Sequence, residues 1–88
     1  MIRKRVLVSG RVQGVYFRDT CRTMALRYGV HGWVRNLPNG RVEAVFEGAA
    51  DAVNRLVEWT RRGPGSATVT DVEVHDEPPE GLRGFKVT

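Results

Sequence analysis

The sequence has few residues that could cross-link the chain or hold a metal ion. Its one cysteine, Cys21, excludes a disulfide within the chain, and its place on an apolar stripe with helical spacing favours a buried thiol over a nucleophile. The two histidines, His31 and His75, lie far apart and have no partners at the spacing of metal ligands, which favours surface or structural roles. We therefore expect no metal site.

Long apolar runs are also absent. No stretch approaches the roughly 20 apolar residues of a membrane-spanning helix. The basic opening, residues 1–6, lacks a hydrophobic segment long enough for export. A length of 88 residues suits one domain. We expect a single domain over residues 1–88, located in the cytoplasm and not attached to a membrane.

Lysine is scarce, with two residues against twelve arginines, yet the chain has a formal net charge of +4 and a pI near 10.0. This basic character raises the alternative of a nucleic-acid-binding module. An RNA-recognition motif needs paired aromatic residues on its central strands, and the strand-like run 42–46 lacks them. Charges of both signs are interspersed, as on an ordinary solvated surface. We therefore expect no nucleic-acid partner.

The apolar pattern predicts two helices and several strands. Helical spacing marks residues 17–28 and 49–60, while strand-like runs include 6–8, 42–46, 69–75 and 85–87, with one more strand ending at Asn36. The order β-α-β-β-α-β plus a short terminal strand is that of the ferredoxin-like, or split βαβ, fold. We expect an α+β protein with both helices on one face of a mostly antiparallel sheet, and Trp59 packed at its helix margin.

A glycine-punctuated loop, Gly10–Arg18, connects the first strand to the first helix. The amides at a helix N-terminus have no partners within the helix, and the helix dipole makes this end positive, so the natural guest is an anion. Gly10 and Gly14 can adopt positive φ, which lets successive amides curl around such a guest, and Arg18 adds a permanent charge. The loop matches neither a Walker A motif nor a dinucleotide-binding fingerprint. The plainer alternative is a tight connection with a surface arginine.

Asn36 ends the strand that enters a hairpin predicted at Asn39-Gly40. The strand leaving that hairpin alternates apolar and polar residues, which predicts one buried face and one solvated face. If the first two strands form a right-handed crossover, their carboxyl ends lie at one edge of the sheet, and Asn36 lies beside the glycine-containing loop. The alternative is an asparagine that caps its own loop.

These segments closely resemble the acylphosphatase family. The resemblance covers nearly the whole chain and rests on Val8–Arg18, on Gly32–Asn36 with Gly40, and on Glu47-Gly48, Trp59, Gly63-Pro64 and Gly84–Val87. It implies a small enzyme that hydrolyses the carboxyl-phosphate bond of acyl phosphates without a metal or organic cofactor. The family's phosphate-binding arginine falls on Arg18 and its water-positioning asparagine on Asn36. We expect the phosphate to be held by Gln13, Gly14, Val15, Tyr16, Phe17 and Arg18.

The reaction that this resemblance implies needs neither a strong general acid nor a metal from the protein. The leaving group is a carboxylate, so positioning and charge stabilisation suffice, and amides with a guanidinium supply both. Neither motif contains a histidine or carboxylate, and we therefore expect a phosphate oxygen of the substrate to accept the proton of water. The expected partners are an acyl phosphate and orthophosphate, bound by a monomer. A module of a larger carbamoyl-transfer enzyme is a further alternative, against which the length of the chain argues.

Overall fold

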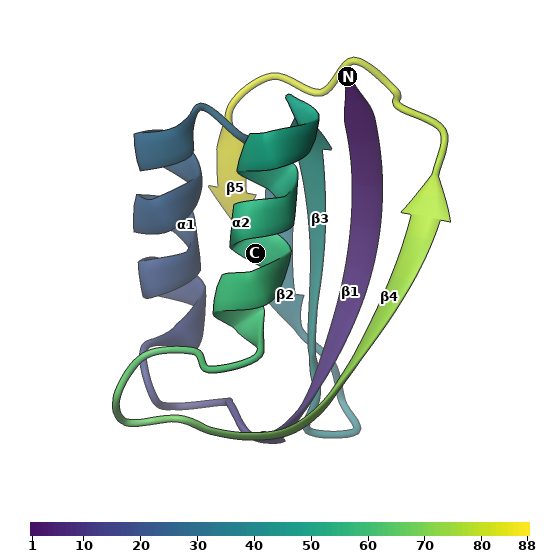
Figure 1. The fold of residues 1–88 in the computed structure, drawn as a ribbon. Coiled ribbons are helices and arrows are strands. Elements are labelled where there is room, and N and C mark those ends of the chain that lie inside the picture. The colour runs from purple at the N-terminus through teal and green to yellow at the C-terminus, as the bar shows by residue number, and fades with distance from the viewer.

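Two helices cover one face of a five-stranded sheet in the computed structural model, which describes residues 1–88 (Figure 1). The elements in chain order are β1 (Ile2–Arg11), α1 (Phe17–Tyr28), β2 (His31–Asn36), β3 (Val42–Gly48), α2 (Ala50–Thr60), β4 (Thr68–Glu77) and β5 (Phe85–Val87). Neither helix is long and apolar enough to cross a membrane. The predicted ferredoxin-like α+β fold is confirmed.

The sheet has the strand order β4-β1-β3-β2-β5, and only the β2–β5 pair is parallel. Because β1 and β2 both pair antiparallel with β3, which lies between them, they run in the same direction. This is the predicted crossover. The loop after β1 and the β2–β3 hairpin consequently lie at the same end of the strands, the lower end in Figure 1.

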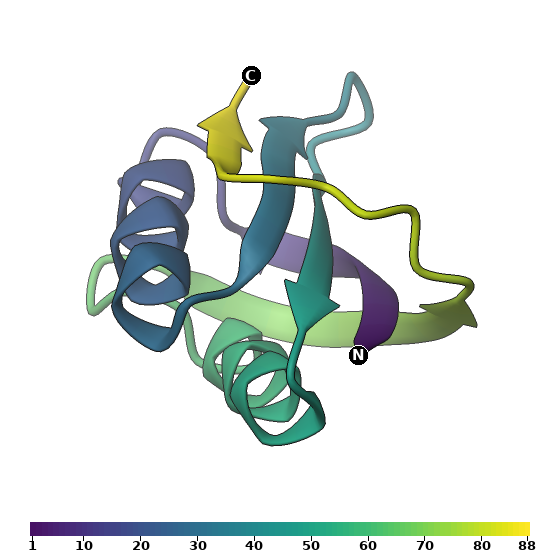
Figure 2. The ribbon, with the colours of Figure 1, turned by 90° about the horizontal axis from the view of Figure 1, so that it is seen from above.

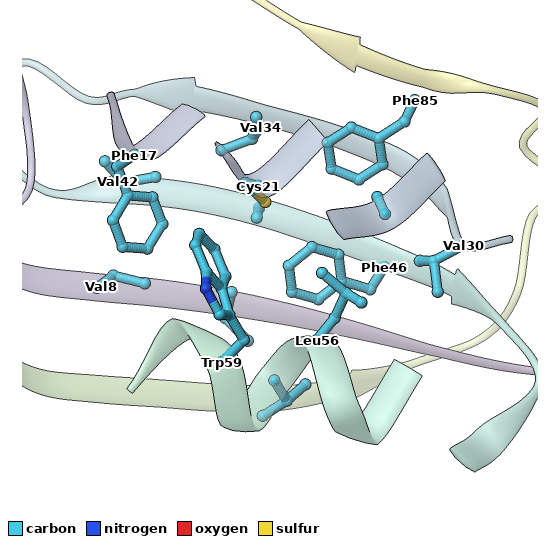
Figure 3. Packing of buried hydrophobic residues seen from close by; sticks show 14 of the residues in the cluster. Val8, Phe17, Cys21, Val30, Val34, Val42, Phe46, Leu56, Trp59 and Phe85 are labelled. Carbon is cyan, nitrogen blue, oxygen red and sulfur yellow. The ribbon is translucent and has the colours of Figure 1, made fainter. Parts of the chain in front are cut away.

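The core lies between the helices and the sheet and contains 17 buried apolar residues (Figure 3). Cys21 is fully buried, as predicted. The expectation that Trp59 packs at a margin is wrong, because its ring lies 5.1 Å from that of Phe17 and only 9% of the residue is exposed. Phe17 begins α1, so this contact fixes the start of that helix against α2.

The side of the sheet away from the helices is partly covered as well. Every residue of β3 is buried, so the predicted solvated face of this strand is wrong. Part of the cover is the connection from β4 to β5, which are the two outermost strands; Figure 2 shows residues 78–84, which we call the strap, crossing between them. The side chains of Arg5 and Arg35, which form ion pairs with Glu43, are another part. His31 Nδ1 accepts a 2.9 Å hydrogen bond from the amide of Gly84 at the end of the strap, a structural role of the kind predicted.

The buried carboxylate of Glu47 on β3 anchors the strap. It accepts amide hydrogen bonds from Glu80, Gly81 and Leu82 at 3.0, 2.9 and 3.2 Å, and a 3.0 Å bond from the guanidinium of Arg3. Burial alone would raise the pKa of Glu47, but these donors outweigh it and hold the pKa below its ordinary value.

The strand β1 is longer than predicted and contains Gly10. The pairing with β4 shifts register between Ser9 and Gly10, which marks a bulge, and Gly10 has a φ of 119°. A Cβ here would overlap the carbonyl oxygen of Thr68. Gly10 therefore allows a close approach of two strands, and the prediction that it belongs to the anion-binding loop is wrong.

Candidate active site

A pocket of about 350 Å³ opens where β1 passes into α1. Its lining contains four residues predicted for the site, namely Gly14, Tyr16, Phe17 and Arg18, together with Val12, Asp19 and Val87. The volume is at the low end of the roughly 300–1,000 Å³ typical of small-molecule sites. Asn36, Gln13 and Val15 do not line it, and the structure gives each of them a different position around it.

The loop backbone leaves its amides without partners. Outside the helices and strands, no backbone hydrogen bond has an amide of residues 13–17 as donor, and the first bond of the helix runs from the Thr20 amide to the Tyr16 carbonyl at 3.1 Å. Gly14 has a φ of 73° and Tyr16 a φ of 62°. For tyrosine this left-handed conformation costs about 1 kcal/mol or more. The loop therefore presents unpaired N–H groups at the positive end of α1.

The side chains of Val15 and Phe17 pack into the core of the protein. Both residues are buried parts of the core, and the Val15 carbonyl accepts a 2.8 Å hydrogen bond from the hydroxyl of Ser66. The backbone amides of these two residues are therefore the groups that the loop offers to an anion. Their side chains instead hold the loop against the body of the protein.

Gln13 joins the loop to the β2–β3 hairpin. Its side-chain Nε2 donates to the carbonyl oxygens of Leu37 and Arg41 at 2.8 and 2.9 Å. The side-chain amide group is therefore bonded within the protein, and the backbone amide of Gln13 remains for a phosphate. Because the bonded residues are 24 and 28 positions away, no local pattern in the sequence indicates this contact.

Arg18 is the second residue of α1, and its Nη1 donates to the main-chain oxygen of Thr88 at 3.0 Å. The amide of Thr88 in turn donates to the carbonyl of Val34 on β2 at 2.9 Å. Two successive hydrogen bonds thus hold Arg18 beside the strand that ends at Asn36. The other N–H groups of the guanidinium make no hydrogen bond within the protein, so they remain for an anion.

Asn36 ends β2 and has the same strand parity as Val34, which is buried under the helices. Its Oδ1 is buried and has no hydrogen-bond partner. The alternative that Asn36 caps its own hairpin is therefore wrong; Asn39 does so, accepting a 3.0 Å bond from the amide of Arg41. A buried oxygen without a donor costs about 1–3 kcal/mol, which indicates a position kept for a ligand or water.

Asp19 and Val87 are pocket residues that the sequence analysis did not assign. Asp19 follows Arg18 in the first turn of α1, where an acid also suits the helix dipole, so its position in the sequence pointed to no ligand. Val87 comes from β5, at the other end of the chain, and reaches the pocket only because the strap brings β5 beside β2.

Comparisons with known proteins agree with this arrangement. The family model described as Acylphosphatase matches residues 4–87. The acylphosphatase of Rubrobacter xylanophilus is 64% identical over 86 residues, which cover 97% of this chain and 78% of the relative. That of Trichormus variabilis is 59% identical, with 99% and 86% covered. The crystal structure of acylphosphatase from Bacillus subtilis superimposes with a TM-score of 0.96 at 37% identity, covering 100% of this chain and 99% of that one.

The family match spans the glycine-containing loop, the hairpin with Asn36 and the strand that carries Val87, and the solved relative has the same fold from end to end. On the strength of sequence and structure together, this chain belongs to the acylphosphatase family.

Proposed function

We propose that this protein hydrolyses acyl phosphates, with the amides of residues 13–17 and Arg18 holding the phosphoryl group and Asn36 orienting water. Water attacks phosphorus, the bond between phosphorus and the acyl oxygen breaks, and the electron pair of that bond leaves with the carboxylate. The acyl phosphate dianion and water give a carboxylate and dihydrogen phosphate, so charge and protons balance. The family membership of the chain supports this reaction.

The loop and Arg18 supply the charge stabilisation. Charge in the transition state is spread over the equatorial oxygens of the phosphoryl group, where fixed N–H donors are most effective. The amides of residues 13–17 make no bonds that a phosphate would have to break. The Arg18 guanidinium is held on one side by Thr88, so it is already oriented before substrate binds.

The observation that carries the role of Asn36 is its buried, unpartnered Oδ1 at the same edge of the sheet as the loop. A carboxamide oxygen accepts a hydrogen bond, and water is the donor in this reaction. Holding the water in line with the leaving oxygen reduces the entropic part of the barrier. The water proton passes to a phosphate oxygen, and the reaction needs neither a metal nor an organic cofactor.

The first experiment replaces Arg18 by alanine and uses Arg22→Ala, one turn further along α1, as the matched control. We expect Arg18→Ala to lose both phosphate affinity and turnover of benzoyl phosphate by at least a hundredfold, by analogy with the loss of one oxyanion donor. The circular dichroism spectrum should stay unchanged. Assays run with a chelator and a phosphate monoester test metal independence and selectivity. Near-normal turnover by Arg18→Ala would refute its role.

The second experiment replaces Asn36 by alanine, with Asn39→Ala in the same hairpin as the control. Because Asn36 is proposed to hold water, kcat should fall about a hundredfold while the inhibition constant of orthophosphate changes less than threefold. Equal losses in kcat and in phosphate affinity would instead indicate that the pocket had collapsed.

We also propose that the protein acts as a single domain over residues 1–88, as a monomer in the cytoplasm, without a nucleic-acid partner. The pairing of basic residues on β1 and β2 supports the last point: Arg3, Arg5 and Arg35 all form ion pairs with glutamates, which leaves less free positive charge for a phosphate backbone. Light scattering of the purified protein tests whether it is a monomer. A salt-dependent RNA retention assay tests the absence of a nucleic-acid partner.

A further inference from the structure

The pocket extends beyond the groups that would hold a phosphate, and the rest of its wall has a distinct character. Val12, Tyr16, Phe17 and Val87 are apolar, and Asp19 is the one acid among the lining residues. Val12 and Phe17 belong to the buried core. Tyr16 is therefore the one large side chain of this wall that is mostly open to a ligand, with 76% of the residue exposed.

Packing within the protein does not account for Tyr16. Its ring takes part in neither of the aromatic pairs nor in either of the cation-π contacts of the structure, and its hydroxyl makes no hydrogen bond. Its φ of 62° is a conformation that glycine or asparagine adopts more easily. An exposed aromatic ring at a strained position on a pocket wall offers an apolar face to whatever follows the phosphoryl group.

Asp19 gives the same wall a negative charge. The residue is exposed, forms no ion pair and lies next to Arg18, the one basic residue of the lining. The formal charges of the pocket side chains therefore cancel. Asp19 would therefore repel a substrate that carries a second negative charge on its acyl part, because the pocket lining has no further basic residue to offset it.

Building on the proposed function, we infer that Tyr16 and Asp19 select the acyl group of the substrate. The preferred class is acyl phosphates with an apolar, uncharged acyl part, aromatic ones above all, and acyl groups with an additional carboxylate are disfavoured. Tyr16 contributes attraction for the ring, and Asp19 contributes repulsion of the second anion.

The test compares kcat/KM for benzoyl, acetyl and succinyl phosphate in the wild type and in variants. In Tyr16→Asn, which removes the ring but tolerates positive φ, the ratio of benzoyl to acetyl phosphate should fall about threefold to tenfold. In Tyr16→Phe, which keeps the ring, the ratio should stay within about twofold of the wild type. Ratios between substrates cancel any general effect of the substitution on the loop.

In Asp19→Asn the ratio of succinyl to acetyl phosphate should rise about threefold to fivefold at low ionic strength, and less in about 0.5 M salt because salt screens exposed charges. The matched control is Asp51→Asn, which removes an acid from the first turn of α2, outside the pocket, and should leave the ratio unchanged.

The outcomes separate this inference from the proposed function. If the wild type hydrolyses none of the three compounds, both fail. If the wild type is active but either ratio fails to move, or if Asp19→Asn lowers the turnover of all three substrates equally, the selection is refuted and the proposed hydrolysis stands.

Discussion

Replacing Glu47 by glutamine should destabilise the protein far more than a single-atom change normally does. Two oxygens of Glu47 accept four hydrogen bonds: Oε1 from the amides of Gly81 and Leu82, and Oε2 from the amide of Glu80 and from Arg3. Glutamine turns one of these oxygens into an NH₂ group, which faces two donors whichever way the amide is placed.

At least two hydrogen bonds to a charged acceptor are then lost, each worth about 1.5–3 kcal/mol, and the buried Arg3 loses a partner. Breaking a buried ion pair in this way costs about 3–5 kcal/mol, and we expect that range here. Urea unfolding at neutral pH measures it. The control is Glu58→Gln, whose exposed pair with Arg61 should be worth about 0.5 kcal/mol or less.

The pH dependence provides a second measurement. The pKa of Glu47 is lowered in the folded state, so its contribution is complete above the unfolded pKa of about 4.3 and is lost as the pH falls through the folded pKa. The difference in stability between the wild type and Glu47→Gln should therefore shrink in acid. A cost below about 1 kcal/mol at neutral pH, or a difference that grows in acid, would refute the reasoning.

Three further substitutions or treatments test other parts of the structure. Gln13→Ala removes two hydrogen bonds to the hairpin and should lower kcat about tenfold or more with a loss of about 1–3 kcal/mol in stability; unchanged kinetics would contradict its role as a tether. Gly10→Ala brings a methyl group onto the carbonyl of Thr68 and should cost about 3 kcal/mol or more by urea unfolding, whereas a loss under about 0.5 kcal/mol would argue against the bulge. Burial raises the pKa of Cys21, so a thiol reagent at pH 8 should label it only in urea, and rapid labelling of the native protein would contradict its burial.

The order of the elements and the position of the glycine-containing loop were predictable because both depend on local patterns. The spacing of apolar residues identifies α1 and α2, and the Asn39-Gly40 pair identifies the hairpin. The crossover rule places this hairpin at the same end of the strands as the loop. Arg18 at the start of α1 followed from the same patterns. The catalytic roles of Arg18 and Asn36 stay predictions until the variants are assayed.

The contacts that complete the pocket were not predictable because they join distant parts of the chain. The alternation along β3 indicated a solvated face for Glu43 and Glu47, but Glu43 pairs with arginines of the two neighbouring strands and the strap covers Glu47. The path of the strap depends on the pairing of β5 with β2. Gln13 was likewise predicted to hold the phosphate, but its side chain bonds to the hairpin instead. Gly10 was assigned to the loop because glycine can adopt a positive φ. In the structure this φ serves a bulge in β1, and the sequence alone does not distinguish a bulge from a loop.

The hydrogen bond between Arg18 and Thr88 joins residues 70 positions apart, and it has a consequence for biosynthesis. A nascent chain that has emerged as far as Glu77 already contains the glycine-containing loop and Asn36, but nothing yet orients the guanidinium from the side. Turnover should therefore begin only after β5 has docked, so that catalytic competence reports the last step in the folding of this domain and not its early stages.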